Sequence, residues 1–468
     1  MFKIIKLNSE SSESSQKDQK NSKAYDPKEY TKKLSVIEGM CWSAMVGFGT
    51  YFITPFALLF GASSFIIGII RSLSTLATAA GQYIGAWYVR FAKRRKDAAS
   101  TFAFIQALLW IPLLLPFVFP IENKPLIIVV IYSAISFFGA LISPLWSSLM
   151  RDIVDKNERG RYFGLRNKYT GFIEFVSSII AGMLLSATVG NPFLGFGLIF
   201  GISCVFRLIS SKLLQQHHEI RLKPRRETFY RMIRLPHNRF FNNVLILSAG
   251  MVFATAIAGP FFAVYMLRDL GFDYLSFSIS LAASTFAYII TQPYWGIVID
   301  KYGTRPVLFA TSVLIPFIPL LWLPVTNLST AILVQLYSGV VWAGFDLSTF
   351  NFLLKVAPRR DVHYYAAHLN GLSSLATFCG GIAGSILIAN LENTTIGLIS
   401  GIQILFVISA LARLIVVFIG VPRIIRNMSV DAASFLTRVI TVYPIKGILA
   451  EITTTRNFVG ELIGHRHR

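Results

Sequence analysis

The chain has 468 residues, of which 54% are hydrophobic and only 14% are charged, against a usual charged fraction of ~25%. With a mean hydropathy of +0.58, this composition excludes a water-soluble protein, because one core cannot bury so much apolar surface. The net charge of +21 does not indicate nucleic-acid binding, since the charges lie between apolar runs. The three cysteines, Cys41, Cys204 and Cys379, have no metal-ligand spacing, so we expect neither a disulfide nor a zinc site.

Twelve apolar stretches are long enough to cross a membrane as helices, which predicts an all-α integral membrane protein. They are expected at 34–59, 64–89, 98–120, 125–149, 168–189, 192–213, 243–267, 276–299, 306–325, 330–354, 370–390 and 395–420. A basic linker, 214–242, divides them into six-helix bundles at 34–213 and 243–420. The Ser- and Lys-rich N-tail, 1–33, is expected to be disordered.

The basic residues give the orientation. Of the 44 Lys and Arg, 39 lie in the tails, the linker and every second loop, while Lys124 and Arg268 alone lie on the opposite side. The other three, Arg71, Arg207 and Arg413, fall within spans. Because basic loops stay on the inner side, both termini are expected in the cytoplasm of a multi-pass plasma-membrane protein.

The C-tail, 421–468, is expected to contain a helix on the inner membrane surface. Apolar side chains between 435 and 443 fall on one helical face, and Arg438 lies near the other. A soluble partner for this helix is the alternative.

The two halves of the sequence resemble each other. FGISCVFRLI (200–209) aligns with FVISALARLI (406–415), and IYSAISFFG (131–139) aligns with LYSGVVWAG (336–344). Several matches in the same order at offsets from 202 to 211 indicate a duplication. Six spans return the chain to its starting side, so the halves are parallel repeats.

The loop after the eighth span, GIVIDKYGTRPVL, has the pattern G-x3-D-[RK]-x-G-x-[RK]. The pattern is formed by Gly296, Asp300, Lys301, Gly303 and Arg305. We expect Gly296 to allow a close helix approach and Gly303 a tight turn.

A degenerate copy of this loop follows the second span. It retains Gly85, Arg90 and Arg94 but has Val89 in place of the acid. The loop and the six-plus-six repeat resemble the major facilitator superfamily over residues 34 to 420. The resemblance implies a loop that latches the outward-open state, with these residues in gating roles and only the second copy intact.

Two arginines within spans, Arg207 and Arg413, occupy matching positions of the repeat. They are therefore expected to be structural and able to extend to the cytoplasmic surface. Glu174 lies at a similar depth to Arg207, so an ion pair between them is one expectation and a functional carboxylate the other.

Charges unique to one half are the better functional candidates, since a substrate is asymmetric. Asp346, in the tenth span with Trp342 on its face, is the strongest candidate for binding a cation or a proton, with a structural carboxylate as the alternative. Arg71 and Glu38 are further candidates for substrate or proton. The aromatic and amide candidates are Trp146, Trp342, Asn351, Tyr288 and Gln292.

The sequence thus predicts a secondary transporter of a small organic solute that works by alternating access, with H+ as a candidate coupling ion. It has no P-loop or catalytic triad spacing, so we expect no enzyme activity, no cofactor, no metal and no nucleic-acid partner. The expected partners are the bilayer and the substrate, and the expected form is a monomer. A non-transporting receptor or assembly factor on the same scaffold and a lipid transporter are the alternatives.

Overall fold

The computed structural model describes residues 26–89, 92, 94–120, 122–155, 158–219, 238–357, 362–391, 394–397 and 399–425. Four sequence predictions lie wholly or mostly outside these residues. They are the disordered N-tail before residue 26, most of the basic linker, the interfacial helix of the C-tail, and Arg90 of the gating loop.

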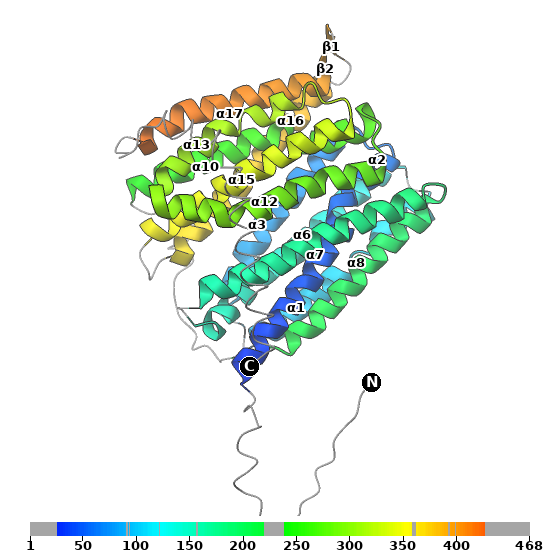
Figure 1. The fold of residues 1–468 in the computed structure, drawn as a ribbon. Coiled ribbons are helices and arrows are strands. Elements are labelled where there is room, and N and C mark those ends of the chain that lie inside the picture. The colour runs from blue at the N-terminus through cyan, green and yellow to red at the C-terminus, as the bar shows by residue number, and fades with distance from the viewer. Residues whose placement is uncertain are drawn as a thin grey trace, which may run out of the picture.

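Among the residues that the structure describes, twelve helical stretches are long and apolar enough to cross a membrane, which confirms the predicted spans. The first bundle comprises α1 (Pro27–Phe48), η2 (Thr50–Phe52), α2 (Ile53–Leu59), α3 (Ser64–Tyr88), α4 (Arg95–Leu108), η3 (Pro112–Leu114), α5 (Leu115–Val118), α6 (Lys124–Ile153), α7 (Arg159–Ala187) and α8 (Pro192–Gln215). The second comprises α10 (Arg239–Ala258), α11 (Phe261–Val264), η4 (Tyr265–Asp269), α12 (Tyr274–Tyr302), α13 (Thr304–Leu314), α14 (Phe317–Leu321), α15 (Leu328–Val356), α16 (Val362–Leu391) and α17 (Gly401–Ile425). Figure 1 shows the two groups side by side, blue to green and green to orange.

The first helix starts earlier than hydropathy indicates, at Pro27 rather than at residue 34. Asp26 caps it by accepting a hydrogen bond from the Lys28 N–H at 2.9 Å, and proline suits the first helical position. Residues 27–33 therefore belong to α1 and not to the tail.

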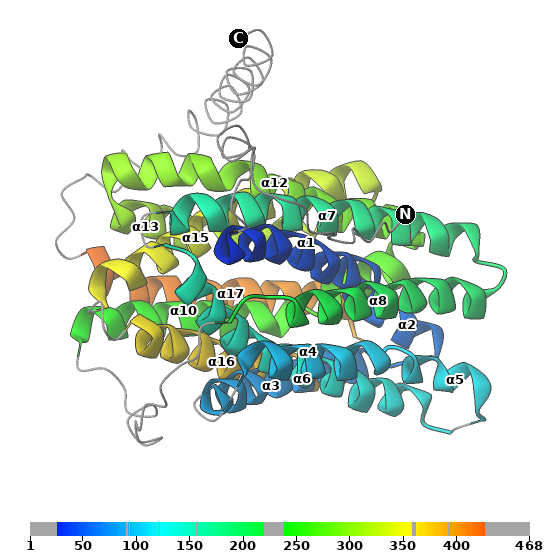
Figure 2. The same ribbon diagram turned by 90° about the horizontal axis from the view of Figure 1, so that it is seen from below.

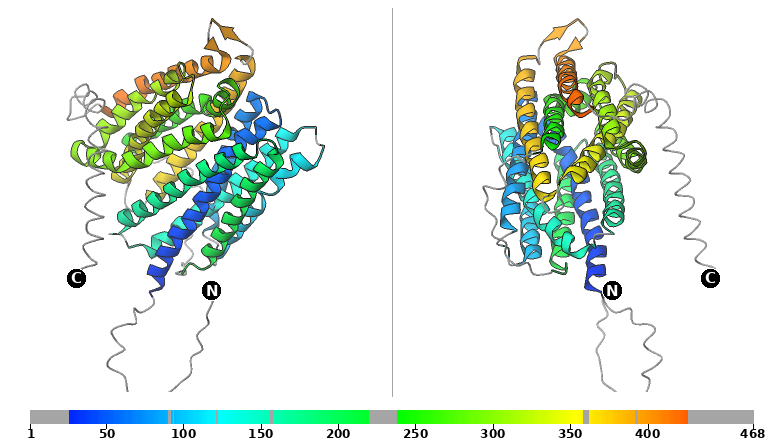
Figure 3. Two further views of the ribbon diagram at one scale, coloured as in Figure 1. Left: turned by 45° about the vertical axis from the view of Figure 1, so that its right-hand side comes forward. Right: turned by 90° about the vertical axis from the view of Figure 1, so that its left-hand side faces the viewer.

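The last span starts later than expected. Residues 395–400 form a small hairpin of β1 (Thr395–Ile396) and β2 (Ile399–Ser400), in which Thr395 pairs with Ser400. Gly397 in the turn has φ of 61°, a conformation that glycine adopts at little cost. Figure 3 shows the hairpin projecting from the ends of the helices.

Helix breaks recur at matching places in the two bundles. The third span is interrupted at Pro112 and the ninth at Pro316, because proline cannot donate the backbone hydrogen bond that would continue a helix. The first and seventh spans are likewise interrupted at Gly49 and Gly259.

The two bundles share one apolar core at one end only. We call the end that holds Pro27, Gln215, Arg239 and Ile425 the linker end, and the opposite end the distal end. The distal cluster unites residues of both bundles; the rings of Phe52 and Phe277, for example, lie 6.3 Å apart. Toward the linker end, each apolar cluster belongs to a single bundle.

Two helix pairs form the interface between the bundles. α3 lies beside α16, where Gly68 contacts Ser385, and α7 lies beside α12, where Gly171 contacts Ile289 (Figure 2). Small residues at such contacts let the helices approach closely, as is typical inside a membrane.

Candidate functional site

Three polar side chains of α12 share one narrow face of the helix. Gly171 and Gly182 of α7 pack on Ile289 and Ser278, and Gly339 of α15 packs on Ser284. At 3.6 residues per turn, a third face lies between these two packing faces. Its polar residues are Thr285, Tyr288 and Gln292.

Asp346 lies against this polar face of α12. The Tyr288 hydroxyl donates a hydrogen bond to Asp346 Oδ2 at 3.2 Å. Asp346 lies ten residues before the end of α15 at Val356, or about 15 Å along the helix axis, and its side chain is nevertheless exposed. The structure therefore brings together three predicted candidates, since Gln292 follows Tyr288 by one turn on the same face.

Arg71 lies on a face of α3 that, like the Tyr288 face of α12, is located between two packing faces. One face of α3 packs on α16 at Gly68 and another packs on α6 at Gly81, and Arg71 lies between them. It is exposed and close enough to interact electrostatically with Tyr51 and Tyr132 of the same bundle. Each bundle thus presents a charged side chain, Arg71 or Asp346, within its spans.

Glu174 accepts a hydrogen bond from the Tyr51 hydroxyl. Tyr51 also interacts with Thr285 of the second bundle, so this polar contact crosses the interface at α7 and α12. The expected ion pair of Glu174 with Arg207 is wrong, because Arg207 is directed toward α1 and pairs with another carboxylate.

That carboxylate is Glu38, which is only 4% exposed and serves two cations. Its oxygens lie 3.5 Å from Arg166 Nη2 and 3.9 Å from Arg207 Nη1. The Ser210 hydroxyl donates to Glu38 at 2.8 Å, and Arg207 Nε donates to Gln106 at 2.7 Å. Glu38 therefore belongs to a buried network within the first bundle, apart from the Asp346 face.

Trp146 joins the same network. The Arg166 guanidinium lies 4.3 Å from the centre of its ring, and its indole N–H donates to the Ser35 hydroxyl at 3.3 Å. Sequence reasoning missed Arg166 because it assigned the residue to a loop. The signal that could have identified it was the repeat, in which Arg166 aligns with His368, a buried basic residue of the second bundle.

The two matched arginines are both 1% exposed, so the expected extension of their side chains to the surface is wrong. Arg413 Nη1 donates to the Ile315 carbonyl at 3.2 Å, and among the described residues no carboxylate pairs with Arg413. The residue of the second bundle that matches Glu38 in the repeat is Asn243, so at this position Arg413 lacks the carboxylate that Arg207 has.

Two further aromatic and amide candidates lie on α15. Trp342 lies one turn from Asp346 and packs edge-on against Phe345, with ring centres 5.5 Å apart. Asn351 lies about 140° around the helix from Asp346 at 3.6 residues per turn. Its amide donates to the Leu347 carbonyl at 3.0 Å, so it does not share the face of Asp346.

The gating loop lies at the linker end, between α12 and α13. Asp300 and Lys301 are exposed, and Asp300 forms no ion pair with any residue that the structure describes. Gly303 has φ of 90°, as a tight turn requires. The expected close approach at Gly296 is wrong, because a Cβ at this position would meet no described atom of a neighbouring segment within 4 Å, whereas a Cβ at Gly85 of the first copy would meet the Leu141 backbone.

Arg94 of the degenerate copy forms a surface ion pair with Asp97 at 3.7 Å. Arg305 of the intact copy lies with its guanidinium 5.2 Å from the centre of the Phe240 ring. The two loops therefore make different contacts although they occupy matching positions.

The sequence matches the family model of the Major Facilitator Superfamily twice, over residues 39–245 and 244–440. The chain therefore belongs to this family of membrane transporters, and its two halves are repeats of one six-span unit. No curated protein matches the chain.

Several solved structures share the fold at low sequence identity. A bacterial homolog of the human lysosomal transporter Spinster, inward-facing and unoccupied, has a TM-score of 0.66 at 12% identity, covering 87% of this chain and 100% of that one. The nucleoside transporter NupG has a TM-score of 0.61 at 15% identity, covering 85% and 99%. A D-xylose-proton symporter has a TM-score of 0.61 at 13% identity, covering 82% and 96%.

Proposed function

We propose that the chain is a secondary active transporter that carries a small organic solute by alternating access and couples it to protons. The observation that carries this proposal is the exposed carboxylate of Asp346, about 15 Å inside α15 and bonded to Tyr288. An ionisable group at that depth is costly in a membrane protein and marks a substrate or proton site. Arg71 provides a complementary cation on the other bundle.

The apolar packing supports the alternating-access part of this proposal. Both bundles join in the distal cluster, whereas their cores are separate toward the linker end. The basic loops lie at the linker end, so we infer that this end and both termini are cytoplasmic. The arrangement then corresponds to an inward-facing state, in which the Asp300 latch is released.

We also infer that the protein resides in the plasma membrane as a monomer that needs no partner subunit. The substrates named for the solved structures, nucleosides and D-xylose, are starting points for a panel of solutes and not assignments.

The test is uptake by the purified protein in liposomes with and without an inward proton gradient, using nucleosides, pentoses, short peptides and metabolites. We expect a proton gradient to stimulate uptake of one class and Asp346→Asn to abolish that stimulation. Asp97→Asn, which alters a surface acid of the first bundle, is the matched control. Gradient-driven uptake that survives in Asp346→Asn contradicts the role of this carboxylate.

A further inference from the structure

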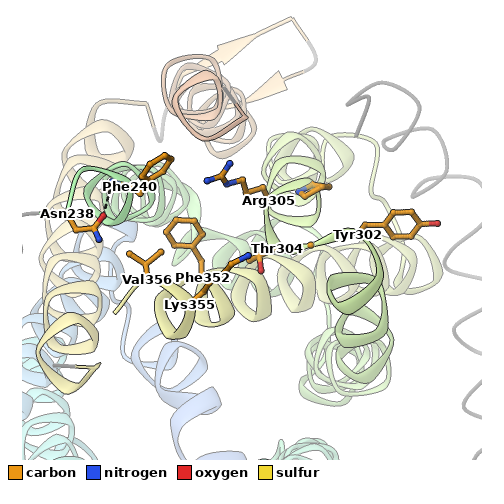
Figure 4. Close-up of a pocket in the computed structure, with 10 residues that line it drawn as sticks. Asn238, Phe240, Tyr302, Thr304, Arg305, Phe352, Lys355 and Val356 are labelled. Carbon is orange, nitrogen blue, oxygen red and sulfur yellow. Dashed lines mark hydrogen bonds between the residues drawn. The ribbon is translucent and has the colours of Figure 1, made fainter. Parts of the chain in front are cut away.

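A pocket of about 540 Å³ lies at the linker end of the second bundle, away from the Asp346 face (Figure 4). It is formed where α10 and α13 begin and α15 ends. Phe240, Phe352 and Val356 give it apolar walls, and Arg305 and Lys355 give it positive charge. Gly303 and Arg305 of its lining also belong to the gating loop, but the proposed function gives the pocket itself no ligand.

The charge of the pocket is of one sign. Arg305 comes from α13 and Lys355 from α15, and among the described residues that line the pocket none is acidic. The Lys355 side chain is exposed and forms no ion pair with any described residue. Two cations at one pocket repel each other, and a bound anion removes this cost.

The helix starts add to the positive potential. Asn238 caps α10 by accepting hydrogen bonds from the Phe240 and Phe241 N–H groups, each at 3.1 Å. α13, by contrast, starts after Gly303, and no side chain caps its first N–H groups. These N–H groups carry partial positive charge and favour an anion in addition to the two side chains.

We propose that this pocket binds a phosphate group, supplied by the headgroup of an anionic phospholipid or by a soluble phosphate. A guanidinium, an ammonium and free helix N–H groups are the donors that recognise phosphate oxygens. The aromatic walls suit the glycerol and first acyl carbons of a lipid. The pocket lies at the ends of the spans, which is the depth of phospholipid headgroups.

The experiment uses the full-length protein purified in detergent. Its thermal midpoint is titrated with phosphatidylglycerol, with phosphatidylcholine as the neutral-headgroup comparison, and separately with inorganic phosphate against chloride at equal ionic strength. We expect a saturable rise of the midpoint with phosphatidylglycerol or phosphate and none with phosphatidylcholine or chloride. A response to the lipid alone identifies a lipid site, and a response to inorganic phosphate identifies a soluble-phosphate site.

Lys355→Gln is expected to weaken the apparent affinity at least about tenfold, the usual loss for one charge-assisted hydrogen bond, and Lys355→Arg to retain it. Arg305→Gln is a second, independent variant with the same expectation. Arg423→Gln is the matched control, since this exposed arginine lies at the same end of the bundle but does not line the pocket. No response to either phosphate source, or equal weakening in Arg423→Gln and Lys355→Gln, overturns the proposal.

Discussion

Glu38 is the buried carboxylate that two guanidinium groups, of Arg166 and Arg207, share in the first bundle. Removing its charge leaves the half-buried Arg166 and the buried Arg207 without their carboxylate partner. We expect Glu38→Gln to lower the free energy of unfolding by about 3 kcal/mol, as when one partner of a buried pair is lost. Unfolding in mixed detergent micelles measures the change.

Glu29→Gln is the control for Glu38→Gln, because Glu29 lies on the same helix but is 55% exposed in its pair with Lys32. An exposed pair contributes at most about 1 kcal/mol. Equal losses of stability in the two variants would show that the contacts of Glu38 with Arg166 and Arg207 do not contribute more than an exposed ion pair does.

His217 gives the fold a dependence on pH. Its side chain lies just beyond α8, and its Nδ1 lies 2.9 Å from the Leu213 carbonyl, while Nε2 is buried without a partner among the described residues. Burial lowers the pKa of His217 below its usual value of about 6.5. The folded state therefore favours the neutral imidazole.

The stability that comes from the neutral imidazole is complete above pH 6.5 or so and is lost as the pH falls toward and through the lowered pKa of the folded state. We expect thermal midpoints to decline below about pH 6.5, and the decline to be smaller in His217→Gln. Parallel curves for the two proteins between pH 5 and 7 would assign the decline to other groups.

At the scale of single residues, the internal repeat determined how many contacts could be predicted from the sequence. The matched positions of Arg207 and Arg413 predicted structural roles, but not that one has a carboxylate partner and the other a backbone carbonyl. Arg166 was missed because α7 starts at Arg159, well before its apolar part, so hydropathy alone cannot show that this arginine is helical. The contact of Tyr288 with Asp346 needs the packing of α12 on α15, which no sequence pattern specifies.

At the scale of elements, Glu219 at the start of the linker is hydrogen-bonded to the first turn of α4. Glu219 accepts hydrogen bonds from the Arg95 N–H at 2.6 Å and from Arg95 Nε at 3.2 Å. The N-cap residue itself, Arg94, makes no capping hydrogen bond, so Glu219 acts as the cap from a distant part of the chain. Arg95 is buried and also pairs with Asp152 at the end of α6.

We expect Glu219→Ala to destabilise the first turn of α4 by about 1 kcal/mol, the usual value of a helix cap. Hydrogen exchange at Arg95 and Lys96 should become faster, while exchange at the start of α3, which Ser63 caps, should not change. Unchanged exchange at the start of α4 would mean that the Glu219 carboxylate does not cap this helix in solution.

The elements themselves were largely predictable, because hydropathy reports which segments the bilayer accepts. It does not report where a helix begins in water, which is why the start of α1 at Asp26 and Pro27 was missed. It also assigned 395–400 to a span, although the turn at Gly397 folds these apolar residues into a hairpin.

At the scale of the whole molecule, the two bundles meet at the distal end through polar as well as apolar contacts. The Ser186 hydroxyl of α7 donates to Asp273 at 3.3 Å and accepts from the Leu275 N–H at 3.0 Å. Both partners belong to the second bundle. The sequence does not predict which end is closed, because closure depends on such contacts between the bundles and not on the packing within each bundle.

Ser186 therefore tests whether the distal closure is one of two accessible states. Ser186→Ala removes both hydrogen bonds but leaves Asp273 free to cap α12 through the Ser276 N–H. At about 1 kcal/mol for each bond, the population of molecules open at the distal end should rise at least about fivefold. The measurement is the rate at which a membrane-impermeant maleimide modifies Ile388→Cys, a fully buried position of the distal cluster, in a background without other cysteines.

Thr188→Ala is the matched comparison for Ser186→Ala, because the Thr188 hydroxyl lies near the same end of α7 but donates only to carbonyls of its own helix. We expect faster modification in Ser186→Ala alone. The distal cluster contains residues of both bundles, so it must separate when the bundles rotate apart at this end. Loss of the two Ser186 hydrogen bonds should make that separation more frequent. Equal rates in the two variants would mean that Ser186 does not hold the distal end closed, and a rigid distal end is incompatible with alternating access.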